Sequence, residues 1–315
     1  MSNSIKLREP WLVAVWPGMG HVALSAGFYL LAKLGMYQLS ELSATELFDV
    51  DHIDVKFGRV LPPQRPRNRF FVWHATAEGQ RDIVVFIGEA QPPLGKYSFC
   101  QSLIDYARDL GVQQVFTFAA MATQMHPEHN SRVFAAATES IPLSQLPEAD
   151  EDLTLLNEGT IGGLNGVLLG AAADKGMPGM CLLGEMPHVF AQLPFPKASL
   201  AILKVFTQLA GIQLDFAELE QQAHEVEQRL AKFLAKLDQQ IARHAQSESE
   251  ESTFASTEQG LAPEDERHIE MLFAAATEDR SRAYELKSEL DRLEVFSEYE
   301  DRFLDLFKKD EDGEP

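Results

Sequence analysis

The sequence predicts a three-layer α/β domain with a mostly parallel mixed sheet, followed by a C-terminal helical extension. β-rich runs alternate with amphipathic segments up to about Gly211, an order typical of a parallel sheet covered by helices on both faces. Residues 69–89 contain two β-branched and aromatic runs around Gly79. Because this pattern indicates a hairpin, part of the sheet should be antiparallel. Beyond residue 211 the apolar residues recur at helical spacing only.

The boundaries of the expected elements follow from turn and helix-end residues. Gly35, Gly111 and Gly211 each follow a helical segment, and glycine adopts the left-handed conformation that ends a helix. In chain order, the expected strands are 12–16, the two arms of 69–89, 112–120, 132–138 and 179–185. The expected helices are 22–34, 97–110, 163–174 and 199–210. Together they form an α/β domain over residues 1–211.

Two apolar stripes follow this domain. The first steps by three or four residues and predicts a long amphipathic helix within 212–245; its members are Leu219, Ala223, Val226, Leu230, Phe233, Leu237 and Ile241. The second predicts a helical arm at 261–307, from Ile269 to Phe296. An acidic linker at 246–260 and a disordered tail at 308–315 complete the chain. Because a single apolar stripe must be buried, we expect an antiparallel hairpin or an oligomerisation arm.

Composition and charge narrow the possible partners and the compartment. Hydrophobic residues make up 45% and charged residues 24% of the 315 positions, as in water-soluble globular proteins. A formal net charge of −21 argues against nucleic acid and anionic membranes. Cys100 and Cys181 lie in apolar surroundings, the N-terminus lacks the order of a signal peptide, and no apolar run approaches the ~18 residues of a membrane span. We therefore expect a cytoplasmic protein.

A glycine-rich loop joins the first strand to the first helix. Residues 18–23, GMGHVA, fit the pattern G-x-G-x-x-G/A, and Glu41 lies where a dinucleotide fold carries its ribose-binding acid. However, residues 37–42 are a weak candidate for the buried strand required there. The loop either binds a phosphate or turns the strand tightly into the helix, and we favour the turn.

Polar residues follow several of the predicted strands. The carboxyl ends of parallel strands share one edge, where ligands usually bind. A candidate ligand crevice therefore contains Gly18, Met19, Gly20, His21, Glu89, Gln91, Asn165 and Glu185. The alternative is that these side chains cap backbone amides. Likewise, the glycines of 158–179 permit close approach of a ligand or of another helix, and we favour helix packing.

No catalytic or metal-binding set is expected. His126 and His129, like Glu185 and His188, have possible ligand spacings, but an intervening proline breaks each helix that would align them. Neither a P-loop nor a G-x-S-x-G motif occurs. We expect no required cofactor, with a nucleotide or a phosphate as the alternative.

Three segments in order resemble the proteasome assembly chaperone 2 family. They are PGMGHVALSAGFYLLAKLG, IGEAQPPLGKYSFCQSLIDYARDLGVQQVFTFAA and EGTIGGLNGVLLGAAADKGMPGMCLLGEMPH, and the similarity spans roughly residues 10–245. The resemblance implies a fold related to nucleoside phosphorylases, usually in homo-oligomers. Prokaryotic members are sometimes labelled as relatives of ATP-grasp-like carboxylate–amine ligases. Eukaryotic members are non-enzymatic chaperones that hold proteasome α-subunits.

The chain departs from this family in two ways. Proteasome-docking chaperones often end in a hydrophobic-tyrosine-any motif, whereas this sequence ends DEDGEP, and the acidic arm beyond residue 246 is additional. We therefore expect a homo-oligomeric interaction scaffold, which could be a trimer or larger, with an unidentified protein partner and no catalysis. The alternative is a small-molecule enzyme or nucleotide binder that uses the Gly18–Gly20 loop and the strand-end carboxylates.

Overall fold

The computed structural model describes residues 6–50, 53–141, 153–244, 263–293 and 295–308. The expected acidic linker and nearly all of the expected tail lie outside these residues. Eight strands form one sheet in the order β2-β5-β6-β1-β7-β10-β8-β9. Their bounds are β1 Trp11–Val15, β2 Tyr37–Glu41, β5 Asn68–Trp73, β6 Ile83–Gly88, β7 Gln114–Thr123, β8 Val133–Ala137, β9 Leu153–Leu155 and β10 Gly179–Pro187. A separate hairpin pairs β3 (Val55–Lys56) with β4 (Arg59–Val60).

The sheet is parallel at its centre, contains antiparallel pairs on either side of the centre, and ends at one edge in the parallel pair β8–β9. Strands β6, β1, β7 and β10 run parallel to one another. Strand β5 pairs antiparallel with β6 and β2, and β8 pairs antiparallel with β10. The hairpin expected around Gly79 is therefore confirmed, as is the mixed, mostly parallel character of the sheet.

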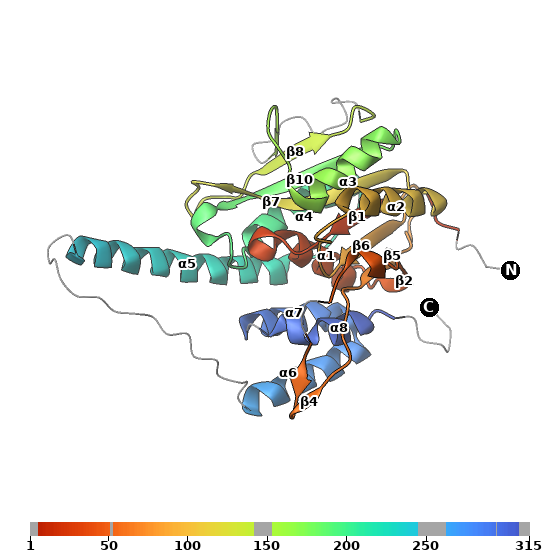
Figure 1. Ribbon diagram of the computed structural model, residues 1–315. Coiled ribbons are helices and arrows are strands. Elements are labelled where there is room, and N and C mark those ends of the chain that lie inside the picture. Colours follow the sequence, from red (N-terminus) through yellow and green to blue (C-terminus); the bar gives the residue numbers. More distant parts are fainter. Residues whose placement is uncertain (1–5, 51–52, 142–152, 245–262, 294, 309–315) are drawn as a thin grey trace.

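Helices cover both faces of this sheet (Figure 1). Helices α2 (Lys96–Asp109) and α3 (Gly163–Asp174) pack on one face, around a core that includes Phe86 and Leu103. On the other face lie α1 (Val22–Lys33), α4 (Pro196–Ala210) and α5 (Ala217–His244). The strands and helices predicted from the sequence are thus confirmed, with boundary differences of a few residues.

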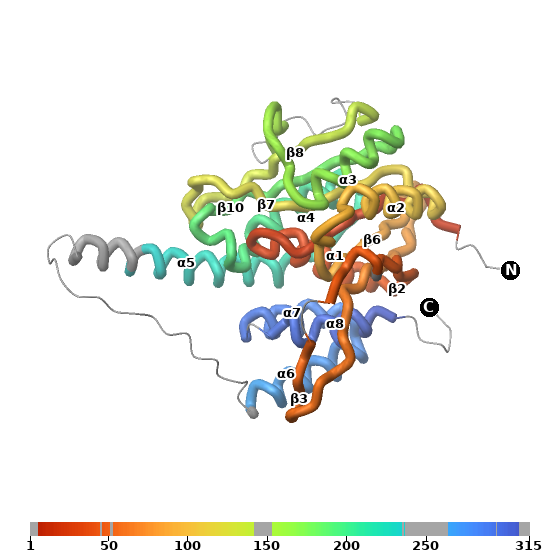
Figure 2. The backbone as a smooth tube through the Cα atoms, in the orientation of Figure 1, coloured from red at the N-terminus to blue at the C-terminus, as the bar shows by residue number. Residues whose placement is uncertain are grey.

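The C-terminal helices form a further layer, on the side of α1 that faces away from the sheet (Figure 2). Where the sequence predicts one arm, the chain forms α6 (Pro263–Glu278), α7 (Ala283–Arg292) and α8 (Phe296–Asp305). Phe28 of α1 packs edge-to-face against Phe296 and Phe303 of α8, with ring centroids 5.1 and 5.4 Å apart. The apolar stripe of the C-terminal helices is therefore buried against the α/β body of the same chain.

The position of strand β2 was not predicted from the sequence. It lies at the edge of the sheet, with β5 and β6 between it and β1. A dinucleotide fold instead places its second strand beside the first. Glu41 consequently ends on the edge strand, remote from the Gly18–Gly20 loop, and binds Arg67. This topology removes the acid that the dinucleotide interpretation required.

Two further sequence features can be placed in the fold. Both cysteines are free and buried, and burial raises the pKa of each thiol to about 12. Within the described residues, no helix combines the length and the apolar character needed to cross a membrane.

Candidate functional site

The Gly18–Gly20 loop packs against the polypeptide that follows β10. Gly20 has a positive φ of 61°, and a Cβ there would lie 2.7 Å from Sδ of Met186. Its N–H donates to the carbonyl of Ala191 at 2.8 Å, and its carbonyl accepts from the N–H of Phe195 at 2.9 Å. The N–H of His21 donates to the carbonyl of Gly18. The amides of Gly20 and His21 are thus bonded to backbone rather than free for an anion, which favours the turn.

Two side chains of this loop point outward. Met19 is 45% exposed. His21 adopts a left-handed conformation, with φ 50°. Although its ring reaches solvent, partial desolvation and then the charge of Lys287 on α7 lower its pKa. The charge of Lys287 on α7 is therefore felt at His21.

Gln91 and Asn165 belong to the α2/α3 side of the sheet. The Gln91 side chain donates to the carbonyl of Pro17 and accepts from the N–H of Leu164, both at 3.1 Å. It thereby ties the end of β1 to the first turn of α3. Asn165 is half-buried, and among the described residues its Oδ1 has no hydrogen-bond partner. Gln91 thus binds backbone groups, as in the alternative interpretation in which these side chains cap backbone amides.

Glu185 is held by two side chains that the sequence analysis did not single out. Arg132 donates to both of its carboxylate oxygens at 2.8 Å, and the Thr123 hydroxyl donates to one of them. The hydrogen bonds from Arg132 hold the pKa of Glu185 below its usual value. A bidentate ion pair of this kind anchors the loop before β8 to β10.

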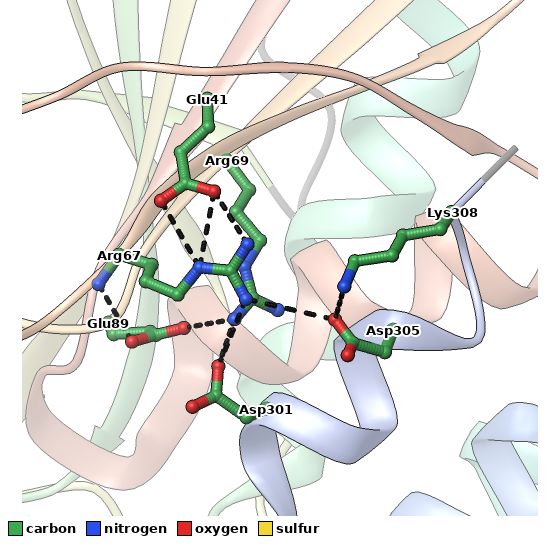
Figure 3. A network of polar contacts seen from close by, with 7 residues as sticks. All are labelled: Glu41, Arg67, Arg69, Glu89, Asp301, Asp305 and Lys308. Carbon is green, nitrogen blue, oxygen red and sulfur yellow. Dashed lines mark hydrogen bonds and ion pairs between the residues drawn. The ribbon is translucent and has the colours of Figure 1, made fainter. Parts of the chain in front are cut away.

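Glu89 instead enters a charged cluster beneath α8. Arg69 of β5, with no exposed surface, places Nη2 2.9 Å from Oε1 of Glu89 and also contacts Asp301 of α8. Figure 3 shows these groups converging from the sheet and the helix. The contact between Arg69 and Asp301 joins residues 232 positions apart. The carboxyl end of the sheet is therefore closed by electrostatic contacts with the C-terminal helices.

Arg67 forms the outer part of this cluster (Figure 3). Its guanidinium binds Glu41 at 2.6 Å and reaches Asp301 at 3.4 Å and Asp305 at 3.7 Å. Its backbone N–H donates to Glu89 at 2.8 Å. The hydrogen bond that Arg67 donates to Glu41 is the main cause that raises the pKa of Arg67. Because these side chains are partly exposed, the outer pairs contribute less to stability than the buried Arg69 pairs.

Several buried polar atoms of the cluster lack a hydrogen-bond partner among the described residues. They are Nε and Nη1 of Arg69, Oε1 of Glu89 and Oε1 of Glu300. The ion pair between Arg69 and Glu89 therefore lacks hydrogen-bond geometry. Burial is the main cause that raises the pKa of both Glu89 and Glu300 from 4.5 to about 7. Two carboxyl groups that change charge near neutrality, beside a guanidinium, could bind or exchange a proton.

Sequence reasoning found Glu89 but missed its partners. Arg69 had a detectable signal, because a charged residue stands at an inward position of the β-rich run NRFFVW. Glu300 and Asp301 had no detectable signal, because the apolar pattern of a helix does not indicate which distant strand the helix covers. Elsewhere in the part of the chain that the structure describes, no three His, Cys, Asp or Glu side chains gather in a way that could hold a metal ion.

Replacing Glu300 by glutamine is expected to change how stability depends on pH. Because the folded-state pKa is raised from 4.5 to about 7, the folded wild type binds more protons than the unfolded chain between these values. The free energy of unfolding that Glu300 contributes is then present below pH 4.5 and is lost as the pH rises through about 7.

Urea denaturation at several pH values measures this difference. The stability of Glu300→Gln relative to the wild type should increase from pH 5 to pH 8. Glu298→Gln, at an exposed position of the same helix, is the control and should show no such trend. A pH-independent difference for Glu300→Gln would contradict the assignment.

Comparison with known proteins agrees with this architecture. The model of the PAC2 family matches residues 12–234. An uncharacterized protein of Methanocaldococcus jannaschii is 28% identical over 249 residues, which cover 76% of this chain and 89% of that protein. The C-terminal helices α6–α8 lie beyond the residues that the family model matches.

Solved structures share the fold. PbaB of Pyrococcus furiosus, described as an archaeal proteasome activator, is 24% identical with a TM-score of 0.61, and the match covers 72% of this chain and 94% of PbaB. A proteasome-assembly chaperone homologue of Mycobacterium tuberculosis is 22% identical with a TM-score of 0.60, covering 71% and 94%. The family model matches more than half of the residues of the present chain. This chain therefore belongs to the PAC2 family.

Proposed function

We propose that the protein is a homo-oligomeric interaction scaffold of the assembly-chaperone type, without catalysis. The main support for this proposal is that the groups expected to form a ligand site instead bind other residues of the same chain. The amide of Gly20 bonds to Ala191, the amide group of Gln91 caps α3, and the carboxylate of Glu185 pairs with Arg132. The strand-end loops thus serve to pack polypeptide against polypeptide.

The relatives support a protein as the partner. Structures of this fold include a proteasome activator and proteasome-assembly chaperone homologues. We infer that this chain holds protein subunits during the assembly of a larger complex, in the reducing cytoplasm to which its two buried free thiols are suited.

Native mass spectrometry of the protein isolated from its own cells tests this role. We expect a homo-oligomer that carries a second kind of polypeptide in a fixed ratio. A monomer devoid of bound protein would contradict both parts of the proposal.

One observation favours the alternative of a small-molecule site. Arg69 is buried, and two of its nitrogen atoms have no partner among the described residues. An anionic group held there would have a guanidinium on one side and the Glu89 and Glu300 carboxyl groups on the other. This alternative therefore requires at least one of the two carboxyl groups to be protonated.

A thermal-shift screen separates the two functions. We expect nucleotides, nucleosides and phosphate to leave the melting temperature unchanged, because the loop amides already have backbone partners. A bound ligand at about 100 times its Kd would instead stabilise the fold by about 2.7 kcal/mol. Gly18→Trp is a suitable variant, since Gly18 is extended, with φ −167°, and faces open space. A ligand-induced rise that Gly18→Trp abolishes would favour the nucleotide binder.

A further inference from the structure

A groove of about 850 Å³ separates α5 from α6 and α7. Leu193, Val226, Leu230 and Leu272 give it an apolar base. Five carboxylates and two guanidinium groups line it as well; the carboxylates are Glu218, Glu225, Glu285, Glu289 and Asp291. Each of these carboxylates also pairs with a basic side chain of the same chain, but the carboxylates still outnumber the guanidinium groups that line the groove. Such a groove suits an amphipathic helix with basic residues beside its apolar stripe.

Helix α5 itself carries such a segment. The helix projects beyond the α/β body, away from the sheet (Figure 1). Its first part, residues 217–228, has four acidic residues and neither Lys nor Arg. From Arg229 to His244 it has four Lys or Arg residues and one Asp. One helix thus combines an acidic half beside the groove with a basic half that extends past it.

The apolar stripe continues into the projecting half. The groove-lining positions Glu225, Val226, Arg229 and Leu230 recur seven residues later as Lys232, Phe233, Lys236 and Leu237. A seven-residue repeat keeps one face of a helix in register. Phe233 is 53% exposed in this chain, and Lys232 and Lys236 are exposed. Lys232, Phe233 and Lys236 therefore face solvent; Lys232 has the opposite charge to Glu225, whereas Lys236 keeps the positive charge of Arg229.

We propose that the projecting half of α5 occupies the groove of a second copy, so that two α5 helices pair antiparallel about a two-fold axis. Antiparallel pairing brings the basic half of each helix beside the acidic half of the other. It also buries Phe233 against the apolar base of the groove. The contact is self-complementary, as a two-fold interface requires. This inference rests on the proposed homo-oligomeric function and names the surface that carries it.

Charge reversal on either side of the contact tests the pairing. Lys232→Glu/Lys236→Glu changes the inserted helix, and Glu225→Lys/Glu285→Lys changes the groove at side chains that are 50% and 54% exposed. Each double variant should keep its fold by circular dichroism and should raise the dimer Kd by about tenfold or more. Light scattering across a dilution series measures the mass.

Mixing the two double variants provides the decisive measurement. The mixed dimer contains two helix–groove contacts. In one contact, the charge-reversed helix of the first variant enters the charge-reversed groove of the second. In the other contact, both the helix and the groove carry their wild-type charges. Equimolar mixing should therefore restore the dimer. Lys96→Glu/Arg108→Glu on α2 makes the same change in charge on the opposite side of the sheet and should dimerise like the wild type.

The outcomes separate this inference from the proposed function. An oligomeric wild type whose mass neither reversal alters, or two variants that stay monomeric when mixed, would overturn the α5 contact and leave the scaffold function standing. A monomeric wild type at about 50 μM, well above the Kd of a micromolar complex, would overturn the inference and the homo-oligomeric part of the function together.

Discussion

Replacing Arg69 by methionine is expected to lower the free energy of unfolding by about 3–5 kcal/mol. The Arg69 side chain is fully buried and binds Glu89 and Asp301. Methionine can fill much of its volume, so the loss arises from the charges that remain. Without the guanidinium, Glu89 keeps a carboxyl group in a place where burial already raises its pKa to about 7. Removing only one member of a buried ion pair leaves the charge of the other member without its partner.

Arg67→Met is the matched control, because the two arginines share Asp301 but differ in burial. The Arg67 side chain is 29% exposed, so its loss should cost about 1 kcal/mol or less. The double variant Arg69→Met/Glu89→Leu should be more stable than the sum of its single changes, since it removes both partners. Urea denaturation of the wild type, Arg67→Met, Arg69→Met, Glu89→Leu and the double variant measures these differences. If Arg69→Met were no more destabilising than Arg67→Met, the buried cluster would not hold α8 on the sheet.

Replacing Phe28 by alanine is expected to cost about 3–5 kcal/mol, the usual result of emptying a large aromatic site in a core. Phe28 is fully buried between α1 and α8, where it meets Phe296 and Phe303. The ammonium of Lys287 also lies 5.2 Å from its ring centre. Phe57→Ala is the control, because Phe57 is 98% exposed at the β3–β4 turn; it should change stability by about 0.5 kcal/mol or less.

Truncation after residue 244 tests the same contact from the other side. Removing α6–α8 would expose the apolar face of α1, and we expect the truncated chain to aggregate. A truncated protein that stays in solution with an unchanged melting temperature would contradict the assignment of the C-terminal helices to the core.

The α/β body could be derived from the sequence because its signals are local. The run Leu12–Trp16 is apolar throughout, as a strand covered on both faces must be. Gly35, Gly111 and Gly211 end helices by their own backbone freedom, and each has a positive φ in the structure. Helix α1 is apolar around its whole circumference, a sign that it is covered on more than one side.

The candidate crevice could be derived only in part. Parallel strands bring their carboxyl ends to one edge, which is why the sequence places Gly18 and Glu89 there. Alternation along a strand then decides which face each side chain joins. Glu185 shares a face with Cys181 and Leu183, which lie in the cluster of Leu169 on α3, whereas Glu89 reaches Arg69 under α8. Small differences in where a strand ends reverse this choice, and the sequence does not fix them.

The sequence by itself determined most strands and helices of the α/β body, their approximate ends and the acidic and basic halves of α5, since each depends on neighbours within a few turns of chain. Only the tertiary structure decided that β2 lies at the edge, that α8 closes the sheet over Arg69, and that a groove remains beside α5. These features join residues far apart in the sequence, such as Arg67 and Asp301, which are 234 positions apart. Their energies depend on burial and on the distance between charges, which exist only once the chain has folded.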